Sequence, residues 1–163
     1  MDLPAGVLDG GDEVSVALWF QTTKTGQQAL ISGANASNSN EFLVFLASDT
    51  NVWFYTGARR NSRVTWKVAS VAYGLWHHLA VVRDGSNSQV TLYIDGASQG
   101  TKSATLNPLQ IDAGGLVLGQ EQDSVGGGYT ASQAFAGTLH EVRLYNQALT
   151  ATEITTLATP PIS

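Results

Sequence analysis

The sequence contains no cysteine, and it carries few charged residues for its length. Without cysteine the chain can form no disulfide, thiol nucleophile or thiolate-ligated zinc site. Charged residues make up 13% of 163 residues and the net charge is −5, which makes nucleic acid an unfavourable partner. No apolar run approaches the ~20 residues that a membrane-spanning helix requires, so we expect no membrane insertion.

What the sequence does contain is short apolar alternation, interrupted by turns. Residues 13–22 alternate with a period of two, which predicts a strand that buries one face. Residues 34–40 are expected to form a polar loop, and Asp95-Gly96 a two-residue hairpin turn. Between Leu139 and Val142 the apolar pattern shifts phase, which predicts a β-bulge. Further strands are expected over residues 28–33, 41–46, 52–56, 64–68, 75–83, 89–95, 115–119 and 137–145.

The end of the chain predicts a helix. Thr150 and Glu153 have the spacing of a capping box, which predicts a short helix ending at Leu157. About ten short strands separated by turn residues are typical of an antiparallel sandwich. We therefore expect an all-β, two-sheet sandwich over residues 1–158 with one short C-terminal helix, followed by a linker over residues 159–163.

One loop combines carboxylates, carboxamides and glycines. It follows the expected strand 115–119 and reads Gln120-Glu121-Gln122-Asp123-Ser124-Val125-Gly126-Gly127-Gly128. Ca²⁺ binds about six to eight oxygen ligands and tolerates irregular geometry, so oxygens converging from such a loop suit it. The loop therefore predicts a calcium site. The alternatives are a purely structural calcium, or a solvated turn that holds no ion.

Three segments resemble the concanavalin A-like, laminin-G-like jelly roll. They are residues 74–83, residues 90–96 and residues 135–146. The resemblance covers nearly the whole chain. It implies that the expected sandwich is a jelly roll.

Within that superfamily, residues 116–127 resemble the calcium-binding stretch of pentraxins. In pentraxins two adjacent Ca²⁺ ions on one sheet face bind phosphocholine or carbohydrate. The resemblance implies that Glu121 and Asp123 are carboxylate ligands and that Gln122 is a backbone carbonyl ligand.

Other positions both extend this resemblance and limit it. Asn40 and Gln133 match two further ligands of the pentraxin pattern. Ser39 and Thr130, however, occupy positions where that pattern has carboxylates. Because fewer anionic ligands weaken calcium binding, we expect one ion rather than two.

Arginines near the expected site favour sugars over phosphocholine as the ligand. The pentraxin choline pocket needs an acidic residue near the position of Arg59 and Arg60, and arginine repels a quaternary ammonium. Vicinal sugar hydroxyls can instead replace water on Ca²⁺. We therefore expect Ser39, Asn40, Arg59, Arg60 and Tyr129 to contact a glycan.

Arginines and tryptophans also have simpler explanations. Arg63, like the two arginines before it, has surface solvation as its alternative role. The tryptophans could stack on sugars, although in a sandwich they are more often core residues. They are Trp19, Trp53, Trp66 and Trp76.

The sequence favours a binding module over an enzyme. Jelly-roll hydrolases carry Glu-x-Asp-x-x-Glu, and here Gly126 replaces the third acid. Residues 1–6 lack the basic and apolar parts of a signal peptide, and we expect a module of a larger protein.

The function expected from the sequence is a calcium-dependent, lectin-like carbohydrate-binding module of a secreted or surface bacterial adhesin or exoenzyme. The alternatives are a structural or protein-binding spacer with a stabilising calcium and a glycan hydrolase. Which sugar binds and the oligomeric state stay open.

Overall fold

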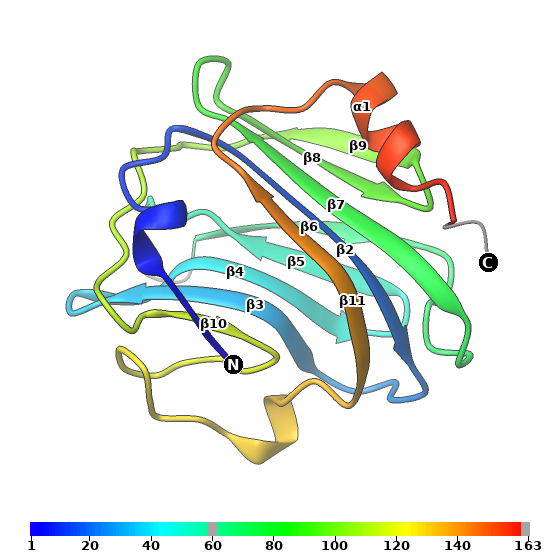
Figure 1. Cartoon of the computed structure of the whole chain (residues 1–163), viewed down its shortest axis with the longest axis horizontal. Helices are drawn as coiled ribbons and strands as arrows, with labels where there is room; N and C mark the ends of the chain where they lie inside the picture. Colours follow the sequence, from blue (N-terminus) through cyan, green and yellow to red (C-terminus); the bar gives the residue numbers. More distant parts are fainter. Residues whose placement is uncertain (59–61, 161–163) are drawn as a thin grey trace.

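Two antiparallel sheets pack face to face (Figure 1). The computed structural model describes residues 1–58 and 62–160. One sheet has the order β1-β10-β3-β4-β5-β6, built from β1 (Asp2–Leu3), β10 (Leu116–Leu118), β3 (Gln28–Asn35), β4 (Asn38–Ser48), β5 (Asn51–Tyr55) and β6 (Arg63–Lys67). The other has the order β11-β2-β7-β8-β9, built from β11 (Gly137–Tyr145), β2 (Glu13–Thr22), β7 (Trp76–Asp84), β8 (Gln89–Ile94) and β9 (Ala97–Ser103). The short helices are η1 (Ala5–Val7), η2 (Ala131–Gln133) and α1 (Ala151–Leu157). The predicted all-β sandwich with one C-terminal α-helix is therefore confirmed.

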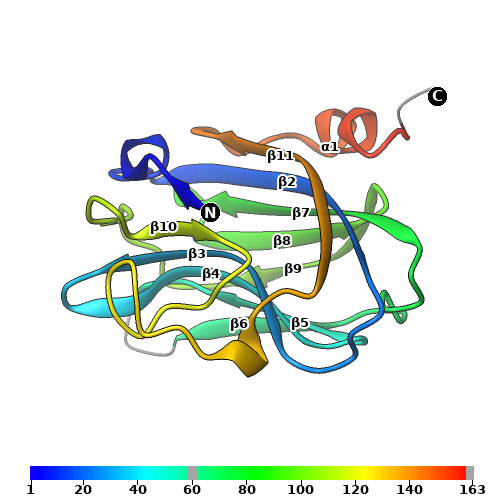
Figure 2. The ribbon, with the colours of Figure 1, turned by 60° about the horizontal axis from the view of Figure 1, so that its bottom comes forward.

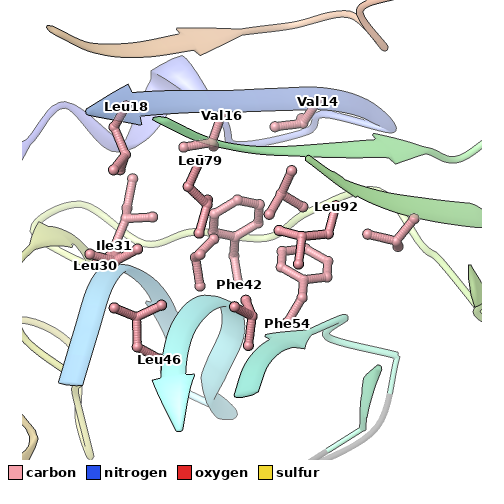
Figure 3. Close-up of a cluster of buried hydrophobic side chains, with 14 of the residues drawn as sticks. Val14, Val16, Leu18, Leu30, Ile31, Phe42, Leu46, Phe54, Leu79 and Leu92 are labelled. Carbon is pink, nitrogen blue, oxygen red and sulfur yellow. The ribbon is translucent and has the colours of Figure 1, made fainter. Parts of the chain in front are cut away.

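The facing sides of the two sheets enclose the main core (Figure 3). The apolar positions predicted in β2 all point into it and are at most 1% exposed: Val14, Val16, Leu18 and Phe20. From the opposite sheet, Phe42 and Phe54 meet edge to face with their ring centroids 5.1 Å apart. Burying each such side chain stabilises the fold by about 1.5–3 kcal/mol. This core fixes the six-stranded sheet, and that sheet carries the candidate site.

Helix α1 covers part of the outer face of the five-stranded sheet. Ile154 from the helix and Leu149 just before it pack with Ala17 on β2, which explains why this outward position is also buried. The helix begins as predicted, because Thr150 accepts a hydrogen bond from the backbone of Glu153 in a complete capping box.

Two local predictions are confirmed in detail. Asp95 and Gly96 join β8 to β9 with φ angles of 51° and 80°, as a two-residue turn with two left-handed residues requires. In β11 the register with β2 shifts between His140 and Arg143, and Glu141 within that bulge has a φ of 48°.

Two other predictions about the strands are wrong. Residues 34–40 are not a loop, because β3 continues to Asn35 and β4 begins at Asn38. The Asn35 side chain closes this tight hairpin by accepting hydrogen bonds from the backbone of Ser37 and Asn38, both at 2.9 Å. Strand β9 was not predicted, because its residues are mostly polar and exposed. An edge strand of this kind shows no apolar alternation in the sequence.

The segment over residues 119–136 leaves β10 and runs along the outer face of the six-stranded sheet (Figure 2). Helix η2 within this segment packs against β3. Lys24 holds it there, since its Nζ donates to the backbone carbonyls of Ser132 and Ala134, each at 2.8 Å. In the described part of the chain, no helix has both the length and the apolar character needed to cross a membrane.

Candidate functional site

The acidic loop, residues 119–128, is anchored by a buried carboxamide. Gln122 is fully buried, and its Nε2 lies 2.8 Å from the Ser32 hydroxyl, 3.2 Å from the Ser32 carbonyl and 2.9 Å from the Gly115 carbonyl. Its Oε1 accepts a hydrogen bond from the Gly126 backbone at 2.8 Å. The loop is therefore pinned to the outer face of β3, and the side chains on either side of Gln122 take fixed places.

These neighbouring side chains are two carboxylates of very different exposure. Glu121 is only 7% exposed, whereas Asp123 is exposed. Burial first, and then the Asp123 charge, raise the pKa of Glu121 from 4.5 to about 7. Across residues 1–58 and 62–160 the ion pairs all lie elsewhere, so neither carboxylate is neutralised by a basic side chain. A buried acid beside a second acid is an unfavourable arrangement that a bound cation relieves.

A groove of about 320 Å³ opens on the Asp123 side of the loop. Its walls are residues 35–39 of the β3–β4 hairpin and residues 123–125 of the acidic loop. Ser39 and Asp123 are more than 80 residues apart in the sequence, yet they line this groove together. The structure thus brings one predicted ligand-contact residue beside one predicted calcium ligand.

The hairpin that supplies Ser39 is held by its own polar network. Asn38 donates to the Glu41 carboxylate at 3.1 Å and accepts a hydrogen bond from the Asn40 backbone at 3.1 Å. The buried Glu41 also accepts from the Gln110 backbone at 3.0 Å. These contacts fix the backbone at Asn40, which follows directly on the groove-lining residues.

The remaining predicted residues are less closely tied to the groove. Gln133 ends helix η2, and its backbone donates to the Thr130 carbonyl at 2.9 Å. Tyr129 is 44% exposed and follows the glycines of the loop. Neither is among the residues that line the groove. Arg59 and Arg60 lie outside the described residues.

The sequence named Trp53 and Arg63 separately, but it did not predict the stack that they form on the same sheet face. Phe45 and Trp53 have ring centroids 6.0 Å apart and nearly parallel planes. The Arg63 guanidinium carbon lies 4.1 Å from the centroid of the Trp53 ring and 5.8 Å from that of Tyr55. The alternation in β4–β6 places these positions on the face opposite the core, but their cross-strand neighbours depend on the register.

The oxygen-rich composition of the site suits a hard cation better than a transition metal. No three histidine, cysteine, aspartate or glutamate side chains in residues 1–58 and 62–160 are grouped closely enough to share an ion. The two loop carboxylates would therefore need carbonyl, carboxamide and water oxygens to complete a shell, which Ca²⁺ accepts readily. The feature that fits this ion is Glu121, which is buried and has no ion pair with a described basic side chain.

The comparisons with known proteins agree with the fold. The family profile described as concanavalin A-like lectin/glucanases superfamily matches residues 1–155. Human Pentraxin-4 is 31% identical over 150 residues, which is 89% of this chain and 31% of Pentraxin-4. The chain thus spans about a third of the length of that relative.

Solved structures show the same architecture. A heptameric SAP-like pentraxin from Limulus polyphemus superposes with a TM-score of 0.79 at 26% identity, covering 98% of this chain and 73% of the pentraxin. Domain 4 of AbnA, an extracellular arabinanase from Geobacillus stearothermophilus in complex with arabinotriose, gives a TM-score of 0.68 at 24% identity, with coverage of 97% and 71%. The second likeness is one of fold alone.

Proposed function

We propose that this chain, which belongs to the concanavalin A-like lectin/glucanases superfamily, is a calcium-dependent carbohydrate-binding module. The observation that carries the proposal is the Glu121 carboxylate, which is buried beside Asp123 and forms no ion pair with a basic side chain of residues 1–58 and 62–160. In the metal-free protein this acid must keep its proton or carry a charge that burial makes costly, and a bound cation removes that cost. A calcium ion supplies the missing charge and leaves coordination positions for sugar hydroxyls.

Residues from three segments would hold the ion. Glu121 and Asp123 would provide carboxylate oxygens, and Gln122 its backbone carbonyl, since its side chain is occupied by the anchor to Ser32. Asn40 and Gln133 are the further ligands we assign. We propose one ion, because Ser39 and Thr130 offer hydroxyls where a second ion would need carboxylates.

The glycan would lie over the groove beside the ion. Ser39 lines that groove, and Tyr129 offers an exposed ring and hydroxyl next to the loop. We also assign Arg59 and Arg60, outside the described residues, to the glycan-binding surface. The sugar-bound arabinanase domain, similar in fold, supports a carbohydrate ligand in general and no particular sugar.

We assign binding and not hydrolysis to this site. Gly126 stands where a jelly-roll hydrolase would carry its third acid, and its backbone is already bonded to Gln122. We further propose that the chain acts outside the cell, as part of a larger adhesin or exoenzyme; the extracellular arabinanase supports this location.

The test is binding to a glycan array with and without calcium. We expect calcium-dependent binding that EDTA abolishes, and that Glu121→Gln and Asp123→Asn each reduce strongly. Asp2→Asn is the matched control, because it removes one exposed carboxylate on β1, the strand paired with β10, and changes none of the proposed calcium ligands. Glycan binding that survives chelation would rule out the calcium mechanism.

The alternative function is a structural or protein-binding spacer that calcium only stabilises. Burial of Glu121 favours calcium in either case, so the two functions differ in their ligand. A spacer would show a calcium-dependent rise in melting temperature and no glycan binding. Release of reducing sugar from polysaccharides would instead indicate a hydrolase.

A further inference from the structure

We propose that Arg63, held against Trp53 on the outer face of the six-stranded sheet, recognises a carboxylate-bearing sugar, so that the ligand is an acidic oligosaccharide. The inference rests on the proposed function, because it adds a second contact to the same glycan-binding surface. It names the class of sugar, which the acidic loop alone leaves open.

The strand register connects this arginine to the acidic loop. The loop is pinned to Ser32 on β3, and Ser32 pairs with Leu43 on β4. Leu43 pairs with Tyr55 on β5, which in turn pairs with Arg63 on β6. Since neighbouring strands lie about 4.8 Å apart, this row spans roughly 14 Å across one face of the sheet. A short oligosaccharide can therefore reach from the acidic loop, which covers Ser32, to Arg63 at the other end of the row.

The guanidinium is held in place by a stack that begins at a buried ring on the outer face of the six-stranded sheet. Phe45 is 3% exposed, and Trp53 stacks on it at 6.0 Å with an interplanar angle of 30°. Trp53 in turn contacts Arg63, whose guanidinium carbon lies 4.1 Å from the centroid of the Trp53 ring. A cation over an indole ring is stabilised by about 0.5–1 kcal/mol at an exposed site. The side chain therefore loses little freedom when it binds a ligand.

Its chemistry favours a planar anion. Arg63 is exposed and forms no ion pair with a described carboxylate, so its charge is available. The guanidinium carries its N–H donors in a planar fork, which matches the two oxygens of a carboxylate. The half-buried Trp53 and Tyr55 offer apolar surface to the C–H groups of the same sugar.

The two ends of this row carry charges of opposite sign. The acidic loop presents two carboxylates that would take the cation, whereas β6 presents a guanidinium that forms no ion pair with a described carboxylate. A neutral glycan would use the first end and leave the second without a partner. A glycan with a carboxylate about three strand spacings from the calcium-bound hydroxyls would use both.

The test is an array of matched oligosaccharides, probed in calcium with the unaltered chain, Arg63→Gln and Lys67→Gln. The array carries galactose and galacturonate oligomers, glucose and glucuronate oligomers, methyl esters of the acids, and sulfated neutral oligomers. Lys67→Gln is the matched control, because it removes an exposed positive charge from the same strand. Calcium-induced changes in melting temperature are measured for all three proteins.

We expect the strongest ligands to be carboxylated and their methyl esters to bind weakly. Arg63→Gln should weaken the acidic ligands by about tenfold or more, as expected for loss of hydrogen bonds to a charged group, and leave neutral ligands and the calcium response unchanged. Lys67→Gln should change these affinities by less than about twofold.

The other possible outcomes would refute either the role of Arg63 or the proposed function. Calcium-dependent binding without a preference for acids, a preference for sulfated sugars, or equal losses for acidic and neutral ligands in Arg63→Gln would overturn the role of Arg63 and leave the proposed function standing. No calcium-dependent binding of any glycan would overturn the proposed function itself.

Discussion

The buried Glu121 leads to a prediction about stability that needs no glycan. In the metal-free protein its pKa is about 7, against 4.5 for an ordinary glutamate. The folded state therefore holds this proton more tightly than the unfolded state. Between pH 4.5 and about 7 the unfolding free energy falls as the pH rises, and above that window the loss is complete. Glu121 therefore lowers the unfolding free energy of the metal-free protein at neutral and alkaline pH.

The size of the effect follows from the pKa difference. A change of one pKa unit corresponds to 1.36 kcal/mol, so the shift amounts to about 3 kcal/mol. Glu121→Gln keeps the shape and removes the charge. In EDTA at pH 8, we expect this variant to be more stable than the unaltered chain by about 3 kcal/mol, which corresponds to roughly 6–12 °C in melting temperature for a domain of this size. Below pH 4.5 the two should melt alike.

Calcium should reverse this order. The ion neutralises the carboxylate and binds only the folded chain, so it should raise the melting temperature of the unaltered protein and leave Glu121→Gln almost unaffected. Differential scanning calorimetry over pH 4–8, in EDTA and in calcium, measures both effects. Asp2→Asn makes the same change in net charge at an exposed position and should behave like the unaltered chain. If Glu121→Gln were no more stable than the unaltered chain at pH 8 in EDTA, the carboxylate would not be a strained cation ligand.

Three further predictions follow from the same structure. Gln122→Leu should lower the unfolding free energy by about 2–4 kcal/mol and abolish the calcium response. The substitution removes the hydrogen bonds that Gln122 forms with Ser32, Gly115 and Gly126, and urea denaturation measures the loss. Calcium affinity should fall about tenfold for each pH unit below about 7 and level off above it, because binding must displace the Glu121 proton; titration calorimetry in two buffers would count that proton. Phe42→Ala should cost about 3–5 kcal/mol in the same denaturation assay, because the ring is 1% exposed, and should leave calcium affinity unchanged while the protein stays folded.

Local chemistry explains why much of the fold was predictable. The alternation in residues 13–22, the capping box at Thr150 and the left-handed turn at Asp95-Gly96 are each decided by neighbours in the sequence. The hairpin at residues 34–40 was not predicted from the sequence, because its Asn and Ser residues suit a loop and a tight turn equally well. Only the pairing of Asn35 with Asn38 across the turn distinguishes the two. Edge strand β9 carries no apolar pattern, since all of its residues except the half-buried Gln99 are exposed.

The candidate site divides in the same way. The sequence by itself determined that one loop holds two carboxylates and that these residue types suit calcium. Only the tertiary structure decided that Glu121 is buried and Asp123 exposed, that the Gln122 side chain is an anchor, and that Ser39 shares a groove with Asp123. It also placed Arg63 over Trp53 on the same sheet face. The physical reason is that burial and cross-strand contacts depend on sheet order and register, which join segments far apart in the chain. The types of ligand that a loop offers, in contrast, are set by consecutive residues.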